Sequence, residues 1–479
     1  MKLHHLLPLL ALASLPAAAA EPNTPPAGFS PLFNGKDLTG WYGWSTQDPT
    51  DLWKMSPEEQ AAYKKKSVEG GLTDKKGAAT TDNINAHWKV ENGEIVNDGK
   101  GLYLTTDKDY GDFELMVEYK ALPDGDSGVY LRGVPQVQIW DTTKGDPRGL
   151  GQDKGSGGLW NNRKGSPGKD PSKKMDKPFG EWNSFKITMV GERVTVVFNG
   201  ETVVDNAVLE NYFANKKAGY LAWTKPGAAP TDKAEQKPVN GFIPDPIFAK
   251  GPIQLQTHGS EIRWRNVFIR EIGTDEANKT LAARDADGFE EHVNGKDLSN
   301  WQNAVDSYEM VDGAIRCKKG KGGDLLTKDE FENGIIRFEY KTPVAGNNGI
   351  ALRTPLGGHS ASDGFEIQVL DSEGYNAAHV DHPLEPYQYN GSLYHCVGAK
   401  HGYERPVGEW NFEEIKVHGS KISVTLNGTK ILDVDTTTFD RSQITHPPKG
   451  LDHTKGYIGF AGHTDPVEFR SFKVKHTTD

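Results

Sequence analysis

The 479-residue chain is poor in cysteine, in positive charge and in long apolar runs. Cys317 and Cys396 are its only cysteines, so they can form one disulfide or remain two free thiols, and a thiolate zinc site has no support. The formal net charge of −11 argues against nucleic acid and anionic membranes as partners. Beyond residue 20 no apolar stretch could span a bilayer, and the chain contains no phosphate-binding loop, nucleotide fingerprint or nucleophile elbow.

The first 20 residues have the composition of a secretory leader. Lys2 precedes an apolar run that ends near Leu15, and Ala18-Ala19-Ala20 supplies the small residues that signal peptidase prefers. We therefore predict a signal peptide over residues 1–20 and an exported protein, periplasmic or extracellular. No cysteine lies near the expected cleavage site, so a lipid anchor is not indicated.

The remaining composition favours many short strands over long helices. Apolar residues make up 35% of the chain, and 54 glycines and 28 prolines supply frequent turns. The chain is long enough for two domains of about 200 residues each, a size that suits one all-β sandwich per domain.

One fold unit occurs twice along the chain. The motif Asn34-Gly35-Lys36-Asp37-Leu38-x-x-Trp41 returns as Asn294-Gly295-Lys296-Asp297-Leu298-x-x-Trp301. Three further pairs follow in the same order: Gly128-Val129-Tyr130-Leu131-Arg132 with Gly349-Ile350-Ala351-Leu352-Arg353, Gly180-Glu181-Trp182-Asn183 with Gly408-Glu409-Trp410-Asn411, and Asn199-Gly200 with Asn427-Gly428. We therefore predict two homologous domains, at 28–272 and 288–476, joined by a polar linker at 273–287.

Strand signals in both copies surround tight turns. Residues 194–198 and 202–204 flank Asn199-Gly200, a dipeptide that tolerates positive φ at both central positions of a hairpin turn. The second copy repeats the pattern around Asn427-Gly428. Because short strands follow one another without helical crossovers, the sequence predicts an all-β fold of antiparallel sheets packed as a sandwich or jelly roll.

One helix is expected in the first copy alone. Ser56-Pro57-Glu58-Glu59 supplies an N-cap, a proline at the first helical position and a capping-box glutamate. This helix belongs to an insertion near residues 48–86 that the second copy lacks. The insertion is either a lid over a site or a surface excursion.

Polar groups gather around one predicted strand of the second copy. Glu366 and Gln368 project from one face of this strand, because side chains alternate with a period of two. Asp371 falls on the other face unless a bulge shifts it or the strand ends before it. Carboxylates and amides on a sheet face suit sugar hydroxyls and acid–base steps, and a solvated polar face is the alternative. Arg353, at a strand end, either holds an oxyanion or forms an ion pair with the retained aspartate.

The first copy keeps only part of this set. Gln136, Gln138 and Asp141 occupy the matching positions, so the aspartate and one amide persist while the glutamate does not. Arg132 corresponds to Arg353. Because the second copy has more carboxylates, we favour it as the catalytic copy.

Aromatic residues and histidines add candidates for sugar contact. Trp160 and Tyr394 follow glycine-rich loops, where a ring either stacks on a sugar or anchors its loop. His258 and His463 align near the last strand of each copy. Such a histidine either donates a hydrogen bond to a sugar, acts as acid or base, or has a structural role.

Two other sets of residues are expected to take no part in chemistry. Trp182 and Trp410 open their strands and are expected in the core. No firm metal-ligand spacing is found, so no cofactor is predicted and a divalent metal remains unsupported, even at the cluster of Asp363, Asp371, His379, Asp381 and His382.

These motifs resemble the DUF1080 family, described as 3-keto-disaccharide hydrolases or 3-keto-glucoside lyases and hydratases. The resemblance implies two tandem concanavalin A-like sandwiches, bacterial export, and action on glycosides whose C3 hydroxyl has already been oxidised. It covers both copies and rests on Leu32-Phe33-Asn34-Gly35-Lys36-Asp37-Leu38-x-x-Trp41, Gly128-x-x-Leu131-Arg132, Gln138-x-x-Asp141, Gly180-Glu181-Trp182-Asn183, Asn199-Gly200 and Leu255-Gln256-x-His258-Gly259.

The chemistry implied by this resemblance needs a base, an enolate stabiliser and an acid. A ketone at C3 acidifies the C2 proton, so a base can form an enolate, the C1 oxygen can leave, and water can add to the enone. Matching positions would make Glu366 or Asp371 the base, Arg353 the stabiliser, and Tyr394 or His463 the acid or substrate contact. Their counterparts in the first copy are Asp141, Arg132, Trp160 and His258.

Each copy departs from the family pattern, which keeps alternatives open. The second copy has Gly459-Phe460-Ala461-Gly462-His463 where the family shows Leu-Gln-x-His-Gly. One alternative is an ordinary β-glucanase-type hydrolase, indicated by Glu366-x-Gln368-x-x-Asp371. The other is a non-catalytic pair of carbohydrate-binding domains. All three interpretations make an oligosaccharide or glycoside the partner.

Overall fold

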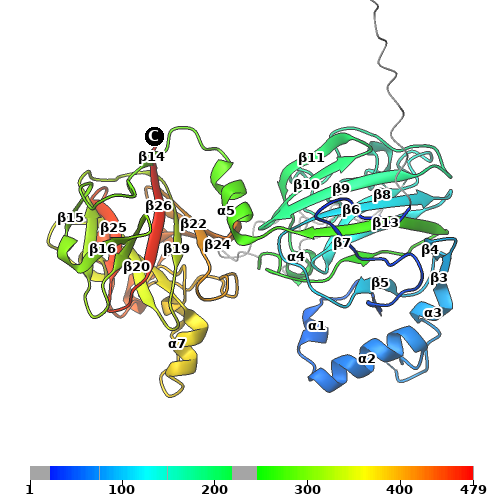
Figure 1. Cartoon of the computed structure of the whole chain (residues 1–479), viewed down its shortest axis with the longest axis horizontal. Helices are drawn as coiled ribbons and strands as arrows, with labels where there is room; N and C mark the ends of the chain where they lie inside the picture. The colour runs from blue at the N-terminus through cyan, green and yellow to red at the C-terminus, as the bar shows by residue number, and fades with distance from the viewer. Residues whose placement is uncertain (1–21, 75, 148, 218–244, 478–479) are drawn as a thin grey trace, which may run out of the picture.

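The two copies form two lobes, seen side by side in the computed structural model (Figure 1), which describes residues 22–74, 76–147, 149–217 and 245–477. The predicted leader lies outside the described residues. We call the first lobe domain 1 and the second domain 2. Each has a larger and a smaller antiparallel sheet with a shared core, so the predicted all-β sandwich fold is confirmed. Among the described residues, no helix combines the length and apolar character needed to cross a bilayer.

The sheets of domain 1 are built from strands that are neighbours in space rather than in sequence. The larger sheet has the order β11 (Glu201–Val208), β10 (Arg193–Phe198), β9 (Asn183–Val190), β6 (Phe113–Ala121), β13 (Ile262–Glu271), β4 (Glu94–Asn97) and β3 (Trp88–Glu91), with β1 (Ser30–Pro31) paired to β13. The smaller sheet has the order β2 (Trp41–Trp44), β5 (Tyr103–Thr106), β12 (Gln254–Leu255), β7 (Asp126–Leu131) and β8 (Val134–Trp140).

Domain 2 repeats this topology strand for strand. Its larger sheet has the order β24 (Thr429–Asp435), β23 (Lys421–Leu426), β22 (Asn411–His418), β19 (Gly334–Lys341), β26 (Glu468–His476), β17 (Ala314–Cys317) and β16 (Tyr308–Val311), with β14 (Glu290–Glu291) paired to β26. The smaller sheet has the order β15 (Trp301–Asn303), β18 (Gly323–Thr327), β25 (Tyr457–Gly462), β20 (Asn347–Thr354) and β21 (Phe365–Leu370).

Helices are short and peripheral. The insertion of domain 1 contains α1 (Thr50–Trp53), α2 (Pro57–Glu69) and α3 (Ile84–His87), and the predicted capping box of Ser56 and Glu59 opens α2. Next to the sheets lie α4 (Tyr212–Lys217), α6 (Ser360–Asp363) and α7 (Ser372–Ala378). Single 3₁₀ turns occur at Gln152–Lys154, Val305–Ser307, Pro386–Gln388, Thr436–Thr438, Arg441–Gln443 and Lys449–Asp452.

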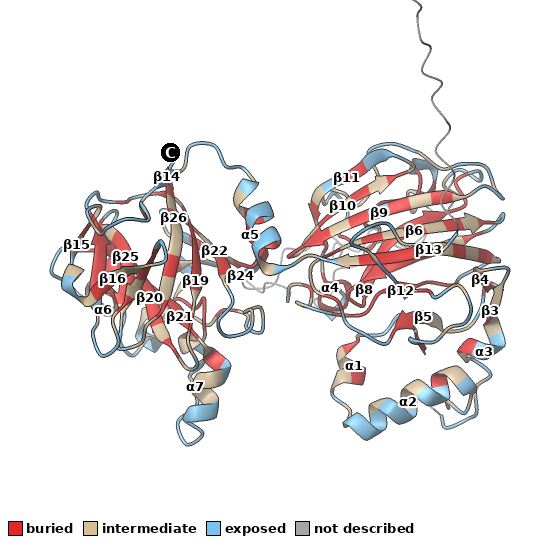
Figure 2. Cartoon of the chain, viewed as in Figure 1, coloured by how far each residue is buried: buried red, intermediate tan, exposed pale blue. Residues whose placement is uncertain are grey.

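Aromatic side chains from both sheets fill each core. Figure 2 shows that the strands of both lobes are rich in buried residues. In domain 1 the rings of Phe185 and Phe198 lie 4.6 Å apart. In domain 2 Phe460 of the small sheet stacks on Phe469 of the large sheet at 4.1 Å. The contact between Phe460 and Phe469 buries apolar area from two sheets at once and stabilises the sandwich.

The predicted hairpins form, and the predicted burial of two tryptophans is wrong. Asn199 and Asn427 both adopt left-handed φ angles, of 48° and 49°, as the Asn-Gly turns require. Asn183 begins β9 with its side chain inward, so the preceding Trp182 faces outward. There Arg265 and Lys120 lie 4.1 and 4.6 Å from its ring centre, a cation–π arrangement repeated in domain 2 by Arg470 and Lys341 around Trp410.

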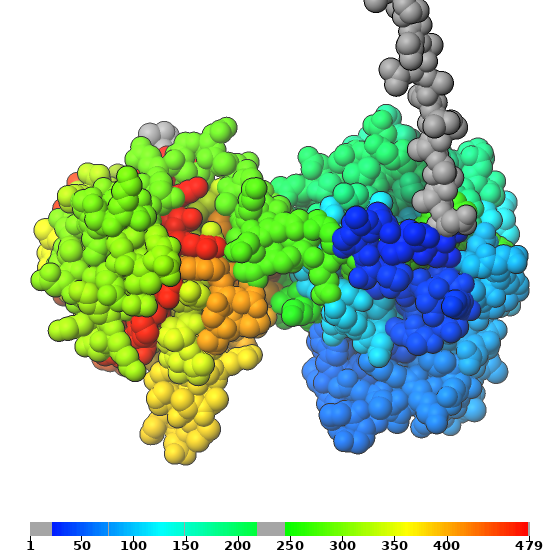
Figure 3. All heavy atoms as spheres, viewed as in Figure 1, coloured from blue at the N-terminus to red at the C-terminus, as the bar shows by residue number. Residues whose placement is uncertain are grey.

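The segment predicted as a linker contains the ten-residue helix α5 (Thr274–Ala283), which lies between the lobes (Figures 1 and 3). Leu281 packs with Val190 of domain 1 and Phe412 of domain 2 in a small apolar cluster. The backbones also meet, because the Glu192 N–H donates to the carbonyl of Gly428 at 3.2 Å. These contacts join the two domains directly.

The two cysteines are free thiols in domain 2. Cys317 is fully buried, and Cys396 is partly buried. Burial raises the pKa of both thiols to about 11.

Candidate active site

The smaller sheet of domain 2 presents a polar outer face. In the register of β20 and β21, Ile350 pairs with Ile367 on the core side. The alternate pairs, Ala351 with Glu366 and Gly349 with Gln368, therefore project outward. The shared face predicted for Glu366 and Gln368 is present.

Glu366 is a buried carboxyl without a hydrogen-bond donor among the described residues. Its side chain lies over Gly349, where an added Cβ would collide with the carboxylate. The residue is only 2% exposed. Burial, and secondarily the charge of Asp324, raises the pKa of Glu366 to about 8. At neutral pH it is therefore a protonated acid that can donate.

Asp324 is a second carboxyl on this face and is not among the site residues predicted from sequence. It lies on β18 beside Ala461 of β25 and accepts hydrogen bonds from the Ser360 N–H at 2.8 Å and the Ser360 hydroxyl at 3.0 Å. Burial raises its pKa. A signal existed: Tyr103-Leu104-Thr105-Thr106 aligns with Asp324-Leu325-Leu326-Thr327, so this position changes from tyrosine to aspartate between the copies.

His463 follows β25 at the end of the same face. Its pKa is lowered, first by desolvation and then by the charge of the neighbouring His359. A lowered pKa leaves the imidazole neutral at neutral pH, with a lone pair that can accept a proton. A protonated carboxyl and a neutral imidazole therefore lie on the same face of one sheet. Their pKa values are shifted in opposite directions.

Tyr394 lies beyond β21, at the edge of the sheet. Leu393 forms a bridge with Ile367, so Tyr394 emerges beside Glu366, and its N–H donates to the Glu366 carbonyl at 2.9 Å. Trp160 has the same place in domain 1, where Leu159 bridges Val137. The equivalence of the two aromatic residues, inferred from sequence, agrees with this geometry.

Gln368 is fixed next to Glu366. Its amide nitrogen donates to the side-chain oxygen of Asn347 at 3.2 Å. Its own oxygen is buried and has no partner among the described residues. That oxygen remains an acceptor.

Arg353 is directed away from this face. It follows a bulge in β20, adopts a φ of 48°, and its guanidinium lies 5.9 Å from the core-facing ring of Phe365. There it donates to the carbonyls of His453 at 2.8 Å and Gly419 at 2.9 Å. Arg132 behaves alike in domain 1, with bonds to the Gly111 carbonyl and the Asp112 carboxylate. Both arginines tie the small sheet to neighbouring loops.

The retained aspartates cap loops at the strand ends. Asp371 follows β21 and accepts from the Ala345 N–H at 2.8 Å and, as the N-cap of α7, from the Gly374 N–H at 3.1 Å. Asp141 accepts from the Thr143 hydroxyl at 2.7 Å and from the Asp124 N–H at 2.9 Å. Burial acts to raise the pKa of Asp141, but these hydrogen bonds outweigh it and the pKa is lowered. The structure does not bring either aspartate into contact with the matching arginine.

On the equivalent face of domain 1, Gln136 and Gln138 occupy the positions of Glu366 and Gln368, next to the carboxylate of Asp126. Gln136 replaces Glu366 and donates to the oxygen of Gln138. Gln138 donates in turn to Asp126 at 2.9 Å, and Nδ1 of His258 lies 3.4 Å from the other oxygen of Asp126. A histidine–aspartate pair is thus present on this face, without a buried acid at position 136.

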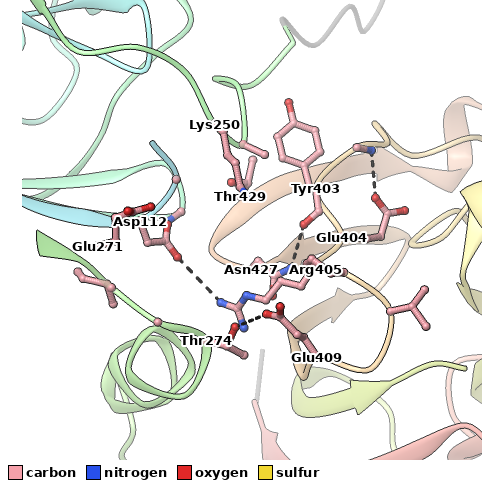
Figure 4. A pocket seen from close by; sticks show the side chains of 18 of the residues that line it. Asp112, Lys250, Glu271, Thr274, Tyr403, Glu404, Arg405, Glu409, Asn427 and Thr429 are labelled. Atoms are coloured by element: carbon pink, nitrogen blue, oxygen red, sulfur yellow. Dashed lines mark hydrogen bonds and ion pairs between the residues drawn. The ribbon is translucent and has the colours of Figure 1, made fainter. Parts of the chain in front are cut away.

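A cavity of about 570 Å³ lies between the domains (Figure 4). Arg132 and Asp371, two of the predicted site residues, line it rather than the sheet faces. Asp112 and Arg405 face each other across it at 4.0 Å, and Thr274 donates to Glu409 at 2.5 Å. In the described part of the chain, no three histidine, cysteine or acidic side chains converge to hold a metal ion.

Comparisons with known proteins agree with the resemblance seen in the motifs. A curated 3-keto-disaccharide hydrolase from Bacteroides thetaiotaomicron is 24% identical over 248 residues, covering 43% of this chain and 85% of the relative. A crystal structure from Parabacteroides distasonis, provisionally named a glycosyl hydrolase, is 23% identical with a TM-score of 0.37 and covers 43% of this chain and 99% of its own. A Bacillus licheniformis β-glucanase is 11% identical with a TM-score of 0.26 and covers 40% of this chain and 97% of its own.

A family model described as the 3-keto-alpha-glucoside-1,2-lyase-like domain matches residues 28–270 and again 288–475. These two matches coincide with domains 1 and 2. The chain therefore belongs to the 3-keto-alpha-glucoside-1,2-lyase-like family and contains two copies of its domain.

Proposed function

We propose that domain 2 cleaves 3-keto-glycosides by elimination across C1 and C2, followed by hydration. One observation supports this assignment above the others: Glu366 and His463 share a sheet face, and their pKa values are shifted in opposite directions. An elimination needs one group that accepts a proton and one that donates it. The family membership and the curated 3-keto-disaccharide hydrolase point to the same chemistry.

In the first step, neutral His463 takes the proton from C2, which the C3 ketone has made acidic. The C–H electron pair forms the enolate of C2, C3 and the C3 oxygen. This enolate then forms the C1–C2 double bond while the C1–O bond breaks, and Glu366 gives its proton to the departing oxygen. Arg353 is engaged elsewhere, so the imidazole of His359, close enough to act on His463, is our candidate donor to the enolate oxygen.

In the second step the two groups exchange roles. The Glu366 carboxylate takes a proton from water, whose oxygen adds to C1. The histidinium returns a proton to C2. The net reaction is hydrolysis, and both residues regain their starting protonation states.

Labelling at C2 tests this mechanism. In deuterated water, turnover of a 3-keto-disaccharide should leave deuterium at C2 of the product. Turnover without label would exclude proton abstraction at C2. His463→Ala and Glu366→Gln should each reduce kcat by roughly 10²- to 10⁴-fold. His258→Ala alters the aligned histidine of domain 1 and is the matched control, which should leave kcat unchanged.

The geometry gives less support to the two alternatives. The glucanase alternative rests on Glu366 and Asp371, and a retaining glycosidase needs two carboxyls about 5–5.5 Å apart on one site. Asp371 instead follows the end of β21, where the Ala345 and Gly374 N–H groups hold its carboxylate as the N-cap of α7. A pair of binding domains does not require a buried, proton-holding carboxyl. Activity on unoxidised β-glucan would favour the glucanase, and unchanged turnover by the Glu366→Gln variant would remove the acid role.

We also propose export, on the basis of the leader over residues 1–20. Protein recovered from the periplasm or medium of an expressing bacterium should then begin after Ala20. Intact-mass measurement checks this, and a secreted protein that retains residues 1–20 would contradict it.

A further inference from the structure

Four aromatic rings form a cluster beside Glu366, which we call the aromatic cluster: Tyr387, Tyr394, His395 and His446. The ring centres of Tyr394 and His395 lie 4.3 Å apart, and those of His395 and His446 lie 5.4 Å apart. Tyr387 lies 5.9 Å from Tyr394 and 5.6 Å from His395. The first three are half-buried and His446 is exposed, so the rings can be reached from solvent.

The backbone around the aromatic cluster is held firmly. Leu393 bridges both Ile367 and Val397, which closes a tight loop against β21. Within this loop His395 has a φ of 64°, a left-handed conformation that non-glycine residues rarely adopt and that is common at binding sites. A capping box between Glu385 and Gln388 fixes the turn that holds Tyr387.

The position of the cluster follows the order of strands across the small sheet. His463 follows β25, β20 comes next, Glu366 lies on β21, and Tyr394 emerges beyond β21. A sugar whose C2 faces His463 and whose C1 oxygen faces Glu366 therefore directs the group attached to that oxygen away from β25. The aromatic cluster lies on that side.

Among the described residues of domain 1, the matching place offers no comparable surface. Trp160 replaces Tyr394, but its ring meets Trp140 edge-on at 5.7 Å, and Nζ of Lys169 lies 5.2 Å from its centre. Its indole N–H donates to the Leu150 carbonyl at 2.9 Å. A ring in this setting serves as a loop anchor, so the open cluster is a feature of domain 2.

We propose that the aromatic cluster is the subsite for the group that leaves from C1, and that this group contains a ring. The proposal rests on the proposed function of the Glu366 face. Aromatic faces attract the C–H faces of pyranose rings as well as other aromatic rings, and a small acyclic group would leave the cluster uncovered. A sugar and an aryl group are the two sources of such a ring.

Three 3-keto-glucosides that differ only in the leaving group test the subsite: one with glucose, one with an aryl group and one with methanol. Tyr387→Ala and His446→Ala should each lower kcat/KM for the glucose-bearing substrate by roughly 3- to 10-fold, the contribution of one ring contact. The methyl substrate should be unaffected. A loss for the aryl substrate assigns the subsite to any ring, whereas an unchanged rate assigns it to sugars.

His401→Ala is the matched control, because His401 stacks on Tyr389 at 4.7 Å and is exposed like His446. It should change none of the three rates. Equal losses for all three substrates in Tyr387→Ala and His446→Ala, or no loss for any, would overturn the subsite while leaving the proposed function intact. Absence of turnover of all three by the wild-type protein would instead refute the proposed function, and the subsite with it.

Discussion

Replacing Glu366 by glutamine should stabilise domain 2 at pH 8 but not at pH 5. Burial raises the pKa of this carboxyl from 4.5 to about 8, so the folded protein keeps a proton that the unfolded chain has released at neutral pH. Stability is therefore lost as the pH rises from the unfolded pKa to the folded one. The loss is roughly 3 kcal/mol at pH 7 and approaches about 5 kcal/mol above pH 8.

The free thiols report on domain 2 alone. Both cysteines belong to this domain, and Cys317 is fully buried. A short pulse of thiol reagent along a urea titration therefore measures the free energy of unfolding of domain 2 within the whole protein. Glutamine has nearly the volume of glutamate, and Gln136 already occupies the matching position of domain 1. The difference in unfolding free energy between Glu366→Gln and the wild type at each pH removes the contributions of other titrating groups.

The difference in unfolding free energy between variant and wild type should widen by roughly 3.5 kcal/mol from pH 5 to pH 8. Glu373→Gln, at an exposed glutamate of α7, is the control and should produce no widening. If wild type and Glu366→Gln lose stability equally over this range, the carboxyl is not held neutral by burial. Its assignment as the acid would then be refuted as well.

Three further predictions concern the same domain. The pH profile of kcat/KM should be bell-shaped, with an acidic limb below pH 6.5 from His463 and an alkaline limb near pH 8 from Glu366. A flat profile from pH 6 to 9 would contradict both roles. Gly349→Ala should lower kcat by roughly 100-fold, because the added Cβ displaces the Glu366 carboxyl. The control Gly128→Ala in domain 1 should have no effect on kcat, and equal losses in the two variants would show that the effect does not come from Glu366. Glu413→Met should stabilise domain 2 by about 1–3 kcal/mol in the thiol assay. The reason is that both Glu413 side-chain oxygens are fully buried without a partner among the described residues, and a loss of stability would contradict it.

The fold was predictable because its signals are local. Period-two alternation placed Glu366 and Gln368 on one face, and Asn-Gly dipeptides marked the hairpin turns at Asn199 and Asn427. The duplication then supplied each signal twice. Trp182 was misplaced because alternation gives two faces but does not say which one is inward at the first residue of a strand.

The site was less predictable because it depends on side-chain direction. The bulge at the end of β20 turns Arg353 from the outer face toward the core side, and no local motif marks that bulge. Asp324 is a single aspartate in an ordinary strand and becomes notable only through its proximity to Glu366, which lies on another strand. Proximity between residues on two different strands cannot be read from any short stretch of the sequence.

The arginines and aspartates retained in both copies turned out to hold the scaffold, whereas the retained histidine pair includes the proposed base, His463. Arg132 and Arg353 bind backbone carbonyls in both domains. Position 136 of domain 1 has glutamine where domain 2 has Glu366, and within the described residues the aromatic cluster is found in domain 2 only. A duplicated fold must keep its loop ties in each copy to remain folded, but its chemistry is needed only once.

Gln136→Glu puts this argument to a direct test. If the acid is all that domain 1 lacks, the variant combined with Glu366→Gln should restore cleavage of the 3-keto-disaccharide, because domain 1 keeps His258 paired with Asp126. If no cleavage returns, the face of domain 1 has diverged at more positions than this one, and Tyr103, which stands in place of Asp324, is the next residue to substitute.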